Sequence, residues 1–468
     1  MTAKLSSWGS PYGSKIITPV DKGQGNVPTV LVRDGSGKTY PAQVVWGKST
    51  PPGFTSKVQF IVDNMPAGGY KTFYVDMAKP GEFNQKIPFD GTTFQTDFFT
   101  VKLDMKTGDI VSLIDKRTSK EFVRQGGRLN TLRMYLEDKK GEMKSWVINK
   151  YTGQEDVTNV EGVKVVEDGP VRACVETVKT WGKSRFIERT YLYRSYPRID
   201  YDMEVRWLET GSDSTDSPML RAVFPLAIEK PRFYCQVPFN VVERPIDGLI
   251  NGKVAPSGQR HSNAYGIMAE ANDGVEVPAQ KWVDVTDGNI GIALLNKTKY
   301  GHSYHNGELR ITLMRAAGDP DIYPNLGKYN ISYSLFPHSG DWKNGVWSEG
   351  EDFNIPVYAA EPPSLALVKE HATRPEEASF FSIDNKGVVM TGLKQSEDGN
   401  ELIVRLCEVE GKEAVVSLTV PVAVNSARRL NLIELPLANV AAPVVNGKTV
   451  QVKIRPNEIV TLGITPGK

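Results

Sequence analysis

The stretch IERTYLYRSYPRIDYDMEVRW, residues 187–207, alternates apolar and polar side chains on both sides of Tyr196-Pro197. Alternation with a period of two puts one set of side chains on each face of a strand, and a Pro-bearing break separates consecutive strands. The stretch therefore predicts two antiparallel strands, each with one buried face.

The same pattern recurs along most of the chain. FTVKL (99–103) and IVSLI (110–114) flank a turn in which Gly108 can take a positive φ, and DGNIGIALL (287–295) opens with an Asp-Gly turn before a strand. The 42 glycines and 30 prolines are enough to supply turns for many strands, and helical periodicity is nearly absent. These features predict an all-β protein.

The length of 468 residues exceeds what one compact core usually holds, about 250 to 300 residues. Polar segments with Pro and Gly, KPGEFNQKIPFDG (79–91) and AEPPS (360–364), are candidate boundaries. We expect a small N-terminal β-domain over residues 1–80, a central β super-sandwich over 81–362 and a C-terminal β-sandwich over 363–468.

Charge and cysteine content exclude several classes of protein. Lys and Arg number 56 against 55 Asp and Glu, so the net charge of +1 argues against a nucleic-acid or membrane-surface partner. The three cysteines, Cys174, Cys235 and Cys407, are too few and too far apart for a disulfide framework or a four-thiolate metal site. No apolar run suits a signal peptide or a membrane span. A cytoplasmic location is therefore predicted.

Three blocks of sequence follow one another in a specific order: EVPAQKWVDVTDGNIGIALLNKTKYG (276–301), GELRITLMRA (307–316) and YNISYSLFPHSGDW (329–342). This series resembles the family 38 α-mannosidases of the bacterial, fungal and cytosolic type. Weaker agreement covers the rest of the chain, including LSSWGSP (5–11) and VPFNVVERP (237–245), where Asn240 stands where a glycine is usual. The resemblance thus extends over the whole sequence.

The resemblance implies the C-terminal β-region of such an enzyme, with a super-sandwich of the galactose mutarotase-like type between two small β-sandwich domains. In that family an N-terminal barrel supplies the aspartate nucleophile, the acid/base carboxylate and a zinc ion held by two histidines and two aspartates. Because this sequence begins where the family's first small β-domain begins, we expect a β-lobe that lacks the barrel. It would carry no catalytic residue, cofactor or metal site of its own.

As such a lobe, the chain is expected to line the substrate cleft and to support the barrel, which would join it in cis or in trans. A mannose-containing carbohydrate is the expected ligand, and a homo-oligomer is compatible with the sequence. Alone, the lobe is expected to be inactive.

Five residues within or beside the three blocks are candidates for substrate binding. Trp282 and Tyr300 either stack on a sugar ring or pack in a core. Arg315 either orients a sugar hydroxyl or carboxylate or forms an internal salt bridge. Asp284 and His338 either contact the sugar or stabilise turns.

A second reading makes the chain a free-standing carbohydrate-binding module, with a mutarotase-like cleft that holds a saccharide through Trp282, Tyr300 and His338. A third, a lyase or epimerase on the same fold, requires a His or Tyr base beside a cleft carboxylate. No motif in the sequence supports the third reading.

Overall fold

The computed structural model describes residues 2–6, 30–46, 55–77, 85–141, 144–146, 148–246, 249–250, 253–254, 276–318, 321, 323, 325–360 and 374–467. Within these residues nearly every regular element is a strand, and the exception is α1 (Val346–Asn354). The all-β class with a large central super-sandwich is confirmed. The segments 78–84 and 361–373 lie outside the described residues, so the boundaries near residues 80 and 362 stay predictions.

The N-terminal part contains two three-stranded sheets. The first sheet has the order β1 (Thr2–Ser6), β5 (Thr55–Phe60) and β4 (Ala42–Trp46). The second has the order β3 (Thr39–Tyr40), β2 (Val30–Asp34) and β7 (Phe73–Met77). Val32, Tyr40, Val58 and Phe60 are buried together between them. Alternation along these short strands therefore produces a small core of its own.

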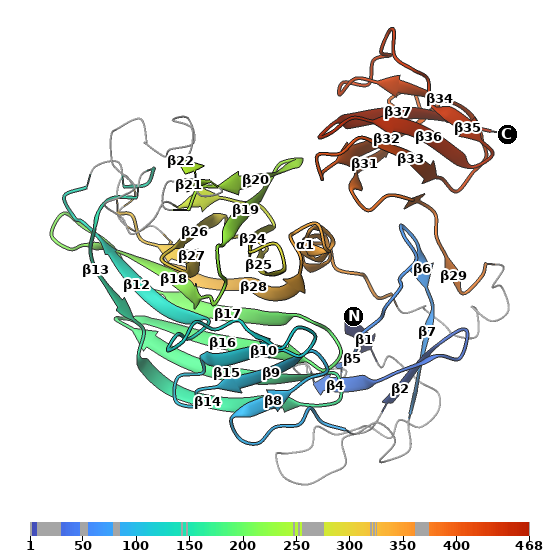
Figure 1. Cartoon of the computed structure of the whole chain (residues 1–468). Coiled ribbons are helices and arrows are strands. Elements are labelled where there is room, and N and C mark those ends of the chain that lie inside the picture. The colour runs from blue at the N-terminus through green and yellow to red at the C-terminus, as the bar shows by residue number, and fades with distance from the viewer. Residues whose placement is uncertain are drawn as a thin grey trace.

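A nine-stranded sheet forms one layer of the central sandwich (Figure 1). Its strands, in order, are β14 (Asn159–Asp168), β15 (Arg172–Trp181), β16 (Ser184–Tyr193), β17 (Ile199–Trp207), β28 (Gly327–Ser339), β25 (Ile290–Asn296), β24 (Trp282–Thr286), β19 (Arg232–Val237) and β20 (Asn240–Arg244). The pair β16 and β17 is antiparallel, which confirms the hairpin expected from residues 187–207.

Two further sheets belong to the central part. The six-stranded sheet has the order β13 (Tyr151–Asp156), β12 (Thr131–Glu137), β18 (Ser217–Pro225), β27 (Glu308–Arg315), β26 (Gly301–His305) and β23 (Val277–Pro278). The four-stranded sheet has the order β11 (Lys120–Glu121), β10 (Ile110–Asp115), β9 (Phe99–Leu103) and β8 (Thr93–Gln95). A two-stranded ribbon pairs β21 (Leu249–Ile250) with β22 (Lys253–Val254). The hairpin of β9 and β10 confirms the expected turn, in which Gly108 has a φ of 78°.

One apolar core joins all three central sheets. In β17 the alternate residues Tyr201, Met203, Val205 and Trp207 are buried and contribute to it. Strand β18 is buried at every position, as expected for a strand whose two faces are both covered. The alternation seen in the sequence is thus the alternation between core and surface.

Helix α1 was not expected from the sequence, and it lies on the outer face of the nine-stranded sheet. Val346 and Phe353 of the helix are buried with Trp282 and Phe336 of the sheet. Glu349, also on the helix, accepts hydrogen bonds from Arg198 and from Tyr196. The helix therefore covers an apolar area that would otherwise face water.

The C-terminal part is a sandwich of two four-stranded sheets, drawn in red in Figure 1. One sheet has the order β30 (Ser382–Ile383), β33 (Ala414–Thr419), β36 (Thr449–Ile454) and β35 (Val444–Asn446). The other has the order β31 (Val388–Gln395), β32 (Leu402–Glu408), β37 (Ile459–Pro466) and β34 (Val424–Leu430). Its apolar core is separate from the central one.

A short ribbon pairs a strand of the N-terminal part with the segment that precedes the C-terminal sandwich. Strand β29 (Glu377–Ala378) pairs with β6 (Tyr70–Lys71) of the N-terminal part. The Tyr70 hydroxyl donates to the Pro375 carbonyl at 2.6 Å, and Lys71 Nζ lies 3.1 Å from a Glu377 carboxylate oxygen. Gly69 permits this approach, because a methyl group there would overlap the backbone carbonyl of Ala378.

We predict that Gly69→Ala destabilises the chain by about 1–3 kcal/mol, since the added methyl group forces two backbones apart. The measurement is thermal unfolding followed by calorimetry. Gly162→Ala is the matched control, because a Cβ at Gly162 meets no atom within 4 Å. Equal unfolding temperatures for the two variants would contradict the proposed contact.

Candidate functional site

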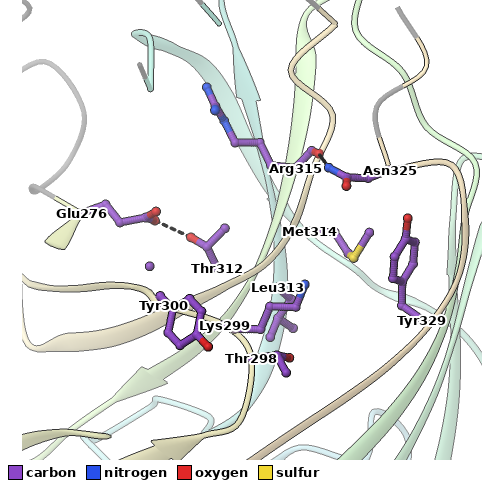
Figure 2. Close-up of a pocket in the computed structure, with 11 residues that line it drawn as sticks. Glu276, Thr298, Lys299, Tyr300, Thr312, Leu313, Met314, Arg315, Asn325 and Tyr329 are labelled. Carbon is purple, nitrogen blue, oxygen red and sulfur yellow. Dashed lines mark hydrogen bonds between the residues drawn. The ribbon is translucent and has the colours of Figure 1, made fainter. Parts of the chain in front are cut away.

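A pocket opens between the two large sheets, at the end where β26 and β28 begin and β27 ends (Figure 2). Its volume is about 260 Å³, and its lining includes Glu276, Lys299, Tyr300, Arg315 and Tyr329. Typical pockets for drug-sized ligands measure about 300–1,000 Å³. The pocket therefore has the size for a small ligand, about as large as a single sugar ring.

The pocket lining includes Glu276, whose side-chain carboxylate is hydrogen-bonded to neighbouring residues. Glu276 accepts hydrogen bonds from the Thr312 hydroxyl and from Arg221, whose Nη2 lies at 2.7 Å. Arg221 is only 1% exposed, and its Nε also donates to the Thr312 hydroxyl at 3.0 Å. Its guanidinium lies over the ring of Tyr135 at 4.9 Å from the centroid. These contacts hold the Glu276 carboxylate in place.

Arg315 lines the same pocket and forms an internal salt bridge. Its Nε and Nη2 donate to the two carboxylate oxygens of Glu137 at 2.6 and 2.8 Å. Burial by itself lowers the pKa of Arg315, but the bonds to Glu137 raise it above the ordinary value. Of the two roles considered for Arg315, the salt bridge is therefore present, and the residue also belongs to the pocket lining.

The connection from β25 to β26 carries Lys299 and Tyr300 from one large sheet to the other. The buried side chain of Asn296 shapes it, because its Oδ1 accepts the Lys299 backbone N–H at 3.0 Å and its Nδ2 donates to the Gln280 carbonyl at 2.7 Å. Tyr300 is 55% exposed, so its ring is free of the core. An exposed ring beside a pocket offers a surface for stacking.

The other three predicted residues, Trp282, Asp284 and His338, lie elsewhere. They occupy β24 and β28 of the nine-stranded sheet, and Trp282 is buried in the apolar cluster beneath α1. The ring centroids of Trp282 and Trp342 are 5.7 Å apart. The structure thus brings Tyr300 and Arg315 together but places this trio in a different, buried region.

Asp284 and His338 form a buried pair. Asp284 Oδ1 lies 2.9 Å from His338 Nε2, and the two side chains are 0% and 3% exposed. Burial alone lowers the pKa of His338, but the adjacent Asp284 carboxylate raises it above its ordinary value. Gly291 on the neighbouring strand makes room for the imidazole, since a Cβ there would collide with the ring.

One histidine and the three cysteines also have shifted pKa values. Burial lowers the pKa of His302 to about 4, so this imidazole stays neutral near pH 7. Burial also raises the pKa of Cys174 and Cys235 to about 12 and that of Cys407 to about 11. Buried thiols of this kind are poor nucleophiles.

Within the described residues, no three side chains of His, Cys, Asp or Glu gather closely enough to hold a metal ion. A protein zinc site needs at least three such ligands. The described part of the chain therefore does not fit a zinc ion. In the same part, no helix has the length and apolar character required to cross a membrane.

Sequence reasoning did not assign Glu276, Lys299 or Asn296 to a binding site. Glu276 and Asn296 lie within the first quoted block, but their partners Arg221 and Gln280 could not be assigned without the sheet pairing. The sequence does offer one signal for Lys299, because it is a cation directly before Tyr300, a candidate residue for stacking on a sugar.

Two family models match the chain. The model described as the C-terminal domain of glycosyl hydrolases family 38 matches residues 94–323, and that of the C-terminal β-sandwich domain of the same family matches residues 387–462. The first match lies in the central part of the chain and the second in the C-terminal part.

Curated relatives and a solved structure are also similar. Alpha-mannosidase G of Dictyostelium discoideum is 26% identical over 319 residues, which are 67% of this chain and 27% of that protein. Human Alpha-mannosidase 2C1 is 26% identical over 74% of this chain and 31% of its own length. An α-mannosidase of Enterococcus faecalis V583 shares the fold, with a TM-score of 0.68 and 17% identity over 94% of this chain and 51% of that one. The chain thus spans about a third of the length of the curated relatives it matches.

We predict that Asp284→Asn destabilises the fold by about 3 kcal/mol near pH 6, because it leaves His338 buried without its anionic partner. Because the pKa of His338 is higher in the folded chain than in the unfolded chain, protonation of His338 stabilises the fold below the unfolded pKa of about 6.5. This contribution is lost as the pH rises through the folded-state pKa of His338. The difference between parent and variant, measured by urea unfolding, is therefore expected to shrink from pH 6 to pH 9. A constant difference across this range would show that His338 is not charged in the fold.

Proposed function

The chain carries the C-terminal domains of glycosyl hydrolase family 38, and we propose that it acts as the β-lobe of an α-mannosidase-like glycoside hydrolase. The observation that carries this proposal is the match of both C-terminal family models, in order, between residues 94 and 462. In this role the lobe lines one wall of the substrate cleft and supports a catalytic barrel that joins it in cis or in trans. The zinc ion and the two carboxyl groups of the reaction would belong to the barrel.

The pocket provides the sugar contact in this proposal. Sugar rings have an apolar face that stacks on aromatic side chains, while carboxylates and hydroxyls bind the ring hydroxyls. Tyr300 offers such a ring, and Glu276 and Thr298 offer polar groups in the same lining. We propose a mannose-containing saccharide as the ligand, with Tyr300 and Arg315 as wall residues. Trp282, which is buried beneath α1, and the buried pair of Asp284 and His338 would influence the cleft only by stabilising the fold.

The comparisons do not favour the free-standing carbohydrate-binding module, because the matched relatives are named as α-mannosidases. We also propose the cytoplasm as the location. The three cysteines are free and buried in the structure, which suits a reducing compartment.

The chain alone, incubated with p-nitrophenyl α-mannoside and zinc, is expected to release no p-nitrophenol above a protein-free control. The reason is that glycoside hydrolysis needs two carboxyl groups flanking the scissile bond, and the proposal places both on the barrel. The measurement is absorbance of the released phenolate. Turnover that follows the chain through two purification steps would overturn the proposal.

We predict that Tyr300→Ala weakens binding of mannobiose at least about fivefold, since an aromatic stacking contact contributes about 1 kcal/mol. Saturation-transfer NMR or calorimetry provides the measurement. Tyr358→Ala is the control, because Tyr358 is 87% exposed but lies outside the pocket lining. If both variants bind like the parent, the pocket is not the sugar contact.

A further inference from the structure

The charges that line the pocket do not cancel. Arg315 is neutralised by Glu137 at 2.6 Å, and Glu276 is neutralised by Arg221 at 2.7 Å. Lys299 is the remaining charged group of the lining. Among the described residues, no carboxylate lies within 4.0 Å of its ammonium. The described residues of the lining therefore carry an excess of one positive charge, located on Lys299.

The Lys299 ammonium is also partly removed from water. Burial is the cause that lowers the pKa of Lys299 below its ordinary value. A lysine that loses hydration without gaining an anionic partner is in a less favourable state than one on an open surface. A ligand that brings an anionic group would restore that lost interaction.

The position of Lys299 is set before any ligand arrives. Asn296 bonds the Lys299 backbone N–H, and the Tyr300 carbonyl accepts the N–H of Ala279 at 3.0 Å. Asn354 of helix α1 donates in turn to the Asn296 carbonyl at 3.0 Å. These bonds fix the backbone of the connection at both residues. Preorganisation of this kind lowers the entropic cost of binding.

We infer that this pocket takes a single-ring sugar that bears an anionic group, a carboxylate or a phosphate. Lys299 binds the anionic group, and Tyr300 stacks against the sugar ring. This inference rests on the proposed sugar contact at the same pocket and specifies its substrate class. Two observations carry it independently of the family: a lysine in the lining with no carboxylate partner in the described part of the chain, and the exposed aromatic ring next to it in sequence.

Calorimetry with three probes, D-mannose, D-mannuronate and mannose 6-phosphate, tests the inference. At least one of the two anionic sugars is expected to bind about tenfold or more tightly than mannose, because charge-assisted hydrogen bonds are the stronger kind. Which of them binds more tightly distinguishes a carboxylate from a phosphate ligand. Raising the salt concentration to 0.5 M is expected to reduce the preference, since screening weakens exposed ion pairs.

Lys299→Met is expected to remove the preference for the anionic sugars over mannose, whereas Lys299→Arg retains that preference. The matched control is Lys297→Met. Lys297 is also a lysine of this connection, but its ammonium lies over the Phe353 ring, 4.9 Å from the centroid, and outside the pocket lining. This control is expected to bind all three probes like the parent.

Equal affinity for all three sugars would overturn the inference and leave the proposed sugar contact standing. An anion preference that survives in Lys299→Met would also overturn it. If none of the probes binds, the inference fails together with the sugar contact. The p-nitrophenyl α-mannoside assay measures hydrolysis by the chain alone and not affinity at the pocket, so it still tests the hydrolase-lobe proposal separately.

Discussion

Burial of the inner faces of the central sheets is the interaction on which the rest of this structure depends. Each fully buried Leu, Ile or Phe contributes about 1.5–3 kcal/mol, and the core that joins the three central sheets contains dozens of such side chains. Tyr201 and Tyr333 stack within it, with ring centroids 5.1 Å apart. Because the two residues lie on neighbouring strands distant in sequence, this core also sets the order of the strands.

Polar groups inside this core restrict how the sheets can pack. Lys179 Nζ lies 2.7 Å from Asp109, and both side chains are buried. The Tyr333 hydroxyl donates to Asn130 at 2.8 Å and contacts Glu188, whose pKa is raised by burial. Lys179 belongs to the nine-stranded sheet, whereas Asp109 immediately precedes β10 of the four-stranded sheet. Since a buried charge without its partner is costly, this arrangement disfavours other alignments of the two sheets.

The pocket lies where this packed core ends. Strands β26 and β28 begin there and β27 ends, so side chains from both large sheets reach the same space. The connection that carries Lys299 and Tyr300 crosses between the sheets and is held by Asn296, which is also bonded to helix α1. A rigid scaffold thus positions an exposed connection, which is the usual arrangement for a binding site on a β-sandwich. The helix contributes to the site by bonding this connection and contributes no side chain to the lining.

The sequence by itself determined the strand class, the hairpin within residues 187–207 and the resemblance carried by the blocks after Glu276, because alternation and short motifs are local properties of the chain. It could not determine which sheet each strand joins, because pairing depends on contacts between distant residues. The tertiary structure decided that Tyr300 and Arg315 share a pocket, while Trp282 lies with its neighbours beneath α1. Only the fold could show that Arg315 is neutralised and that Lys299 has no carboxylate partner among the described residues, because a charge is paired or unpaired only in three dimensions.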